Sequence, residues 1–209
     1  MSRLEQLSDR YREHHRTRRA RDFVFGGDER ARLFRQLVGG PDNRVLDLGC
    51  RYGALTQAYV EGNSVAGVDV DREALAEAAK LGIDTRWADL DERFPFENDV
   101  FDVVVAGELL EHVRDPQHIV TEARRVLRPG GRLVGSVPNA FRLKNRIRFA
   151  LGRPPEADPT HLHMFRPGDV ERLLSDLENV ELRLISSRFL RAHPKLFAND
   201  IVFAGTKPR

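Results

Sequence analysis

The stretch Val45-Leu46-Asp47-Leu48-Gly49-Cys50-Arg51-Tyr52-Gly53 decides the fold of this chain. Its first half is apolar and typical of a buried strand. The two glycines, Gly49 and Gly53, form a turn before a helix that we expect over Ala54–Glu61. Glycines between a strand and a helix let a ligand approach the backbone closely. The stretch therefore predicts a ligand-binding turn at the end of a central strand.

On both sides of this stretch, apolar strands alternate with helices. Such alternation predicts an α/β domain with a parallel sheet and right-handed crossovers. After Pro138 the pattern changes to a helix and an irregular loop, and two more strand candidates follow. The expected strands are Arg44–Leu48, Ser64–Asp69, Ile83–Ala88, Phe101–Ala106, Arg132–Val137, Val180–Ser186 and Asn199–Ala204. The expected helices are Ser2–Ala20, Asp28–Val38, Ala54–Glu61, Arg72–Lys80, Pro116–Leu127 and Pro167–Leu177.

Acidic side chains stand at the ends of three successive expected strands: Asp47, Asp69 and Asp89. A carboxylate at Asp47 would repel the pyrophosphate that a nicotinamide or flavin site holds at a helix N-terminus. It suits a ligand with an ammonium and a sulfonium. Asp69 is placed to accept hydrogen bonds from both hydroxyls of a ribose, and Asp89 to take an adenine amino group. The three carboxylates favour S-adenosylmethionine over NAD as the cofactor.

The run Val45–Gly53 resembles the first motif of class I S-adenosylmethionine-dependent methyltransferases, and Gly67-Val68-Asp69 resembles the second. Phe101–Val105 and Arg125–Gly131 are similar to later landmarks of that superfamily. The resemblance implies a Rossmann-like, seven-stranded, mostly parallel sheet with an antiparallel last strand and helices on both faces. The cofactor-binding residues that we expect from it and from the strand ends are Asp47, Gly49, Gly53, Asp69, Val70, Asp89, Leu90 and Gly107.

One position departs from the family pattern. Arg51 stands where the commonest form of the first motif has its middle glycine, and we expect its side chain to point away from the methionine moiety. Cys50 is expected to be a small, buried turn residue. As the lone cysteine it cannot form an internal disulfide, which favours a reducing cytoplasm.

A second group of candidates follows the fourth expected strand. If a helical turn starts at Glu108, then Glu108, Glu111 and His112 share one face and can hold a hard divalent cation, Mg²⁺ or Mn²⁺. The alternative is that Glu111 and His112 are helix-start residues with local hydrogen bonds.

The E-x-x-E-H pattern is similar to that of UbiG-like ubiquinone-biosynthesis O-methyltransferases and of small-RNA 2′-O-methyltransferases. In the latter family a downstream histidine before an aromatic residue completes the metal site. His163 matches that position best, with His161 as the alternate. The resemblance implies Glu108, Glu111, His112 and His163 as metal ligands. The expected catalytic residues are Glu111, His112 and His163, and without a metal His112 or His163 is the general base.

We expect an N-terminal helical cap over residues 1–40 and the methyltransferase domain over 41–209, with a substrate lid over about 139–166. Phe141–Arg153 carries five cations and no acid. A basic cover favours an anionic acceptor; the alternative is a solvated amphipathic face.

The composition limits the function. The formal net charge is only +2, and the longest apolar runs are far shorter than a membrane span, so we expect no membrane partner. The favoured function is O-methylation of a small, anionic metabolite or sugar. RNA 2′-O-methylation is an alternative against which the small net charge argues. A second alternative is a MetW-like accessory protein that binds a partner enzyme.

Overall fold

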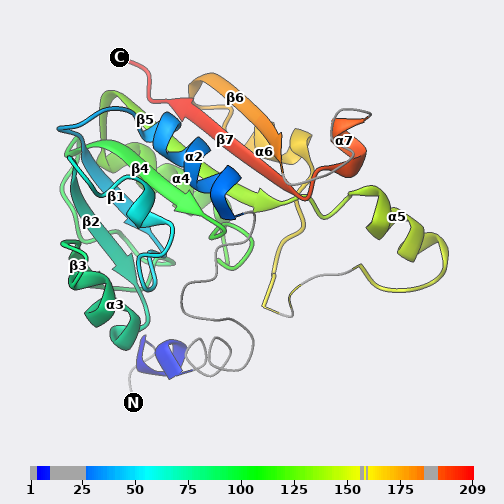
Figure 1. The fold of residues 1–209 in the computed structure, drawn as a ribbon, viewed down its shortest axis with the longest axis horizontal. Helices are drawn as coiled ribbons and strands as arrows, with labels where there is room; N and C mark the ends of the chain where they lie inside the picture. The colour runs from blue at the N-terminus through cyan, green and yellow to red at the C-terminus, as the bar shows by residue number, and fades with distance from the viewer. Residues whose placement is uncertain (1–3, 10–26, 156–157, 159, 186–192) are drawn as a thin grey trace.

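The computed structural model describes residues 4–9, 27–155, 158, 160–185 and 193–209 (Figure 1). Residues 4–9 are helical, and the rest of the expected first helix lies outside the described residues. The helices are α2 (Gly27–Val38), the 3₁₀ turn η1 (Thr56–Ala58), α3 (Arg72–Ala79), α4 (Pro116–Val126), α5 (Leu143–Ala150), α6 (Pro167–Leu173) and α7 (Pro194–Phe197). The strands are β1 (Arg44–Leu48), β2 (Ser64–Asp69), β3 (Asp84–Trp87), β4 (Phe101–Gly107), β5 (Leu127–Pro138), β6 (Glu178–Ile185) and β7 (Asp200–Thr206).

The strands form one seven-stranded sheet in the order β3-β2-β1-β4-β5-β7-β6. The pairs from β3 to β5 are parallel, whereas β7 runs antiparallel to both β5 and β6. This confirms the expected Rossmann-like α/β sheet with its antiparallel last strand. The chain order changes direction between β1 and β4, and open α/β sheets bind ligands beyond the carboxyl ends of the strands at such a point.

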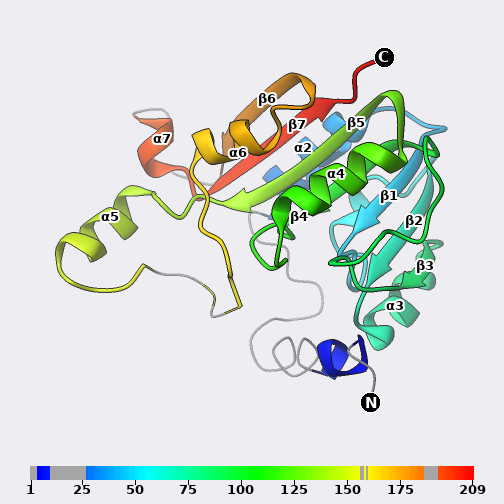
Figure 2. The same cartoon turned by 180° about the vertical axis from the view of Figure 1, so that it is seen from behind.

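Helices cover both faces of the sheet, and alternate strand residues fill a core on each side. Helix α2 lies on the face shown in Figure 1, where Phe34 and Leu37 pack with Val45 and Val103. Helices α4 and α6 lie on the opposite face, seen in Figure 2. There the cluster includes strand residues of the other parity together with helix residues: Leu46, Leu48, Val104, Ala106, Ile119, Ala123, Val170 and Leu174. The two-residue period of the strands therefore supplies both cores.

Two aspartates fix where helices begin. Asp71 accepts hydrogen bonds from the amides of Glu73 and Ala74 and caps α3. Asp115 caps α4 through the amide of Gln117, with Pro116 in the first turn. Each cap lies in the loop beyond the carboxyl end of a strand and marks where that loop ends and the helix begins.

The structure differs from the sequence expectations in two elements. The helix expected over Ala54–Glu61 is reduced to the single turn η1, because the backbone leaves the helical region at Tyr59, where φ is −141°. The strand expected over Arg132–Val137 begins earlier, since β5 already pairs Leu127 with Phe101 and resumes this pairing at Arg132 after an irregularity. The C-terminal segment holds this irregularity, since Gly130 N donates to Lys207 O and Lys207 N donates to Gly131 O.

Helix α2, which forms part of the expected N-terminal helical cap, packs against one face of the sheet. Phe34 is fully buried and Val38 is almost so. Across the described residues, no helix combines the length and the apolar character that crossing a membrane requires.

Close packing at Gly135 on β5 provides a test of the sheet. A Cβ there would lie 2.3 Å from Phe203 Cζ and 2.6 Å from Ala106 O, so the backbone must move. Gly135→Ala should lower the free energy of unfolding by about 1–3 kcal/mol, the usual cost of overpacking. Urea denaturation measures it, with Gly168→Ala as the control because a Cβ at Gly168 meets nothing within 4 Å. Equal stabilities of the two variants would contradict the packing described for β5 and β7.

Candidate functional site

A buried carboxylate lies at the end of the central strand β1. The Asp47 side chain accepts hydrogen bonds at Oδ2 from Thr56 Oγ1 at 2.5 Å and from Tyr59 OH at 2.8 Å. Burial raises the pKa of Asp47 to about 6, although these two hydrogen bonds act in the opposite direction; the nearby Asp69 raises it further. An ionised Asp47 is therefore costly in the free protein, and a cationic ligand would favour its charged form.

Asp69 ends β2 beside this group. Its Oδ2 accepts from the amide of Arg51 at 3.0 Å and its Oδ1 from the amide of Asp71 at 2.8 Å. Burial raises the pKa of Asp69, while the two amides and the Arg51 charge lower it. Two backbone amides thus fix the orientation of a carboxylate at the carboxyl edge of the sheet.

The turn after β1 needs its glycines. Gly49 and Gly53 have φ values of +71° and +76°, which side chains rarely adopt. The amides of Gly49 and Cys50 donate to Val68 O at 2.8 and 3.2 Å, which ties the turn to β2. Cys50 is buried, and burial raises the pKa of its thiol far above the ordinary value. It is a buried turn residue, as expected.

Arg51 keeps the left-handed conformation of the glycine it stands in for, with φ +48°. Its guanidinium carbon lies 5.7 Å from the centroid of the Tyr52 ring. Its charge also lowers the pKa of Asp69, so the guanidinium lies near that carboxylate. The expectation that it points away from the methionine moiety stays a prediction.

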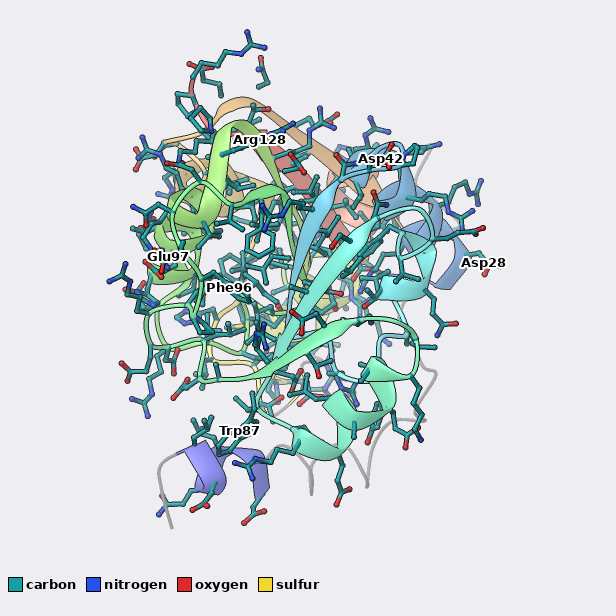
Figure 3. All side chains as sticks on the ribbon, turned by 90° about the vertical axis from the view of Figure 1, so that its left-hand side faces the viewer. Asp28, Asp42, Trp87, Phe96, Glu97 and Arg128 are labelled. Carbon is teal, nitrogen blue, oxygen red and sulfur yellow. The ribbon has the colours of Figure 1, made fainter. Side chains whose placement is uncertain are left out.

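The end of β3 carries the third acid. Asp89 Oδ1 accepts from the amide of Asp91 at 3.0 Å, and Leu90 is buried in the core. Trp87 Nε1 donates to Val70 O at 2.8 Å and so fixes the backbone after β2. The guanidinium of Arg72 covers the Trp87 ring at 3.5 Å. Figure 3 shows Trp87 at the edge of the sheet, near the helical segment of residues 4–9.

Glu108 follows β4 and joins a buried ionic network. Its Oε1 lies 3.2 Å from Arg30 Nη2 and 3.3 Å from Ser136 Oγ. Arg30 Nη2 also lies 3.3 Å from Asp200 Oδ2, and the Arg30 and Asp200 side chains are 2% and 1% exposed. No pattern in the sequence predicted this network, because its members come from α2, the loop after β4, β5 and β7.

The structure brings together Glu111, His112 and His161. One ligand atom of each lies within 4.8 Å of the others. His112 Nε2 is 4.0 Å from Glu111 Oε1, and the His112 and His161 rings are in edge-to-face contact with centroids 4.8 Å apart. The Glu111 side chain is only 1% exposed. A buried carboxylate and two imidazoles at the carboxyl edge have the chemistry of a proton-transfer or metal site.

Two residues expected in this group lie elsewhere. The expectation assumed a helical turn from Glu108, but Glu108 has φ +54° and residues 109–113 form turns, so its side chain diverges toward Arg30. His163 Nε2 lies 3.0 Å from Val113 O and 3.2 Å from Arg114 O, against the backbone. His161, the alternate, takes the place expected for His163. The amides of Leu162 and His163 donate to Glu111 O and fix this arrangement.

The expected lid carries helix α5, which extends beyond the end of the sheet (Figures 1 and 2). The predicted apolar face is not buried, since Ile147 is 51% and Leu151 is 66% exposed. Asn145 is the residue that α5 buries, and its side chain donates to Ala140 O. Helix α5 therefore presents apolar and basic side chains together on its surface.

The sequence of this chain is similar to those of known proteins. Residues 11–182 match a family model described as a methyltransferase domain. A ubiquinone biosynthesis O-methyltransferase of Hahella chejuensis is 36% identical over 125 residues, covering 56% of this chain and 48% of the relative. One of the same name from Vibrio atlanticus is 29% identical over 153 residues, covering 66% and 64%. The matches thus span about half to two thirds of the length of these two relatives.

Solved structures show the same fold. An S-adenosylmethionine-dependent methyltransferase from Archaeoglobus fulgidus superposes with a TM-score of 0.69 at 18% identity, covering 94% of this chain and 99% of that one. A phosphoethanolamine N-methyltransferase of Haemonchus contortus, in complex with S-adenosylmethionine, gives a TM-score of 0.67 at 16% identity, covering 88% and 53%.

The raised pKa of Asp47 leads to a test at this site. One pKa unit corresponds to about 1.4 kcal/mol, so keeping this carboxylate ionised above pH 6 costs on the order of 3 kcal/mol. Because the folded-state pKa is raised, the free protein should lose stability as the pH rises from about 4 to about 6. Asp47→Asn should remove most of that loss and raise the melting temperature at pH 8.

If Asp47 faces the ammonium of S-adenosylmethionine, as the sequence predicts, the same variant should bind this ligand about tenfold more weakly by calorimetry. Asp42→Asn is the control, since Asp42 is exposed at the other end of β1. If Asp47→Asn leaves both the pH profile and the affinity of the wild-type protein unchanged, Asp47 is not the acid that the site uses.

Proposed function

This chain belongs to the class I S-adenosylmethionine-dependent methyltransferases, and from that premise we propose that it methylates a hydroxyl oxygen of a small, anionic molecule. The observation that carries the choice of oxygen is the group formed by Glu111 and His112, which follow β4, with His161 from the segment after α5. The relatives named ubiquinone biosynthesis O-methyltransferase support the same acceptor atom.

The carboxyl edge of β1 to β3 fits the cofactor by its chemistry. Asp69, held by two amides, is assigned to the ribose hydroxyls, and the buried Asp47 to the methionine ammonium. Asp89 is assigned to the adenine amino group, with Val70 and Leu90 beside the ring. Three acids around a cationic ligand give electrostatic complementarity that a pyrophosphate cofactor would not find here.

Gly49, Gly53 and Gly107 complete the assigned cofactor site. The first two give the β1 turn its left-handed conformations. At Gly107 a Cβ would lie 2.8 Å from Leu55 Cδ2, so a side chain would disturb the edge where β4 ends. We assign this edge to the sulfonium and its methyl group.

In the proposed reaction the acceptor oxygen attacks the methyl carbon as the carbon–sulfur bond breaks. S-adenosylhomocysteine leaves as a neutral thioether, and the hydroxyl proton passes to His112 Nε2. The buried Glu111 carboxylate, 4.0 Å from that nitrogen, favours the imidazolium that results.

The same three residues fit a divalent cation. One carboxylate and two imidazoles suit Mn²⁺ better than Mg²⁺, which prefers oxygen ligands. When bound, such a cation would lower the pKa of the acceptor hydroxyl. Glu108, paired with Arg30, and His163, turned toward backbone carbonyls, are not part of the proposed ligand set.

The lid supports an anionic acceptor. Lys144 and Arg146 are exposed on α5, and the segment from Phe141 to Arg153 carries five cations and no acid. Exposed apolar residues beside these cations, such as Phe149 at 57% exposure, suit an acceptor that also has an apolar part.

Glu111→Gln tests the reaction site. It keeps the volume of the side chain and removes its charge, so turnover of an anionic catechol such as protocatechuate should fall by ~10²-fold or more. Affinity for S-adenosylmethionine should stay within about twofold, because the residue lies outside the cofactor edge. Release of S-adenosylhomocysteine measures turnover, and calorimetry measures affinity.

Glu97→Gln is the matched control, since Glu97 is exposed and precedes β4, whereas Glu111 follows the opposite end of that strand. Treating the wild-type enzyme with a chelator and restoring Mn²⁺ tests the cation separately. Full turnover by Glu111→Gln would overturn the assignment of this group as the reaction site.

A further inference from the structure

The imidazole of His112 contacts two oxygens of one residue, Thr160, in the segment after α5. Its Nδ1 lies 3.3 Å from Thr160 O and 3.1 Å from Thr160 Oγ1. The other ring nitrogen, Nε2, is on the side of Glu111, 4.0 Å from Oε1. The segment after α5 therefore contacts Nδ1 of His112, and the proposed reaction uses Nε2.

The chemistry of the two oxygens decides where the proton of neutral His112 lies. A backbone carbonyl only accepts hydrogen bonds, so a bond between Nδ1 and Thr160 O requires Nδ1 to carry the hydrogen. The hydroxyl leads to the same result, because Thr160 Oγ1 donates its one hydrogen to Asp158 Oδ1 at 2.7 Å. An ionised carboxylate cannot donate in return, so Oγ1 presents a lone pair to Nδ1.

Asp158 and Thr160 are held in place by their own turn. The amide of Thr160 donates to Asp158 Oδ1 at 3.0 Å, and the amide of His161 donates to Asp158 O at 3.0 Å. The next residues are fixed to the β4 side, since the amide of Leu162 donates to Glu111 O at 2.7 Å. The turn that presents His161 to the site is thus the turn that contacts His112.

We propose that Asp158 and Thr160 form a hydrogen-bonded relay that holds neutral His112 with its proton on Nδ1 and its lone pair on Nε2. Thr160 and Asp158 are positioning residues, since they act through His112. The catalytic consequence rests on the proposed function: Nε2 then presents its lone pair to the proton of the acceptor hydroxyl.

The relay also links the lid to the chemistry. Both positioning residues belong to the segment after α5, whereas His112 belongs to the loop after β4. The correct tautomer is therefore selected only when this segment lies against the loop.

Nitrogen NMR of the ¹⁵N-histidine-labelled protein tests the relay without any acceptor. The spectrum is taken in chelated buffer at about pH 8, where an imidazole of ordinary pKa is neutral. The His112 signals are identified by their loss in His112→Gln. The expected result is a protonated Nδ1 and an unprotonated Nε2. A proton on Nε2 would overturn the proposal, whatever the enzyme methylates.

Thr160→Val removes the hydroxyl at nearly constant volume, and Thr160→Ser restores it. In the valine variant only the longer contact to Thr160 O, at 3.3 Å, still favours the proton on Nδ1, so the relay predicts a partial shift to the Nε2–H tautomer. It also predicts a kcat about tenfold lower with protocatechuate, with unchanged KM for S-adenosylmethionine. The serine variant should recover both the tautomer and the rate. If Thr160→Val keeps the wild-type tautomer and kcat, the hydroxyl does not position His112. Absence of methyl transfer in the wild-type protein with the Nδ1–H tautomer intact would contradict the proposed function and leave the relay standing.

Discussion

Strand β1 pairs in parallel with β2 and β4, and this pairing sets Asp47 opposite Gly67 on one side and Val105 on the other. Because parallel strands end at the same edge, the register brings the ends of β1, β2 and β4 together. Two buried acids, Asp47 and Asp69, lie at this edge. A slip of one residue would turn Asp47 to the other face of the sheet and separate it from Thr56 and Tyr59.

The edge is built at a cost to the stability of the free protein. Asp47 is buried with a raised pKa, Asp69 is buried beside it, and Arg51 and Glu108 adopt left-handed φ values that favour glycine. Strain and buried charge gathered at one edge are typical of functional sites. A cationic cofactor would offset part of this cost, because its positive charge would interact favourably with the two buried carboxylates.

The sequence predicted the sheet well because its signals there are local. The apolar runs, the glycine turn and the strand-end acids each lie within a few residues. The helix expected after the glycine turn is shorter in the structure, where it is the single turn η1. The reaction site was harder to predict. Glu108 turns away because of Arg30 and Asp200, and His161 rather than His163 joins Glu111 because of contacts between segments about fifty residues apart. Tertiary contacts of this kind leave no pattern in a single sequence.

We propose that the cofactor lies on the carboxyl edge of β1 to β4, with its sulfur facing the group of Glu111, His112 and His161. A crystal structure with S-adenosylhomocysteine tests it most directly. The account predicts both ribose hydroxyls within hydrogen-bonding distance of the Asp69 carboxylate and the sulfur on the side of Gly107 nearest His112. A nucleoside bound away from Asp69, or a sulfur that faces away from those three residues, would contradict it.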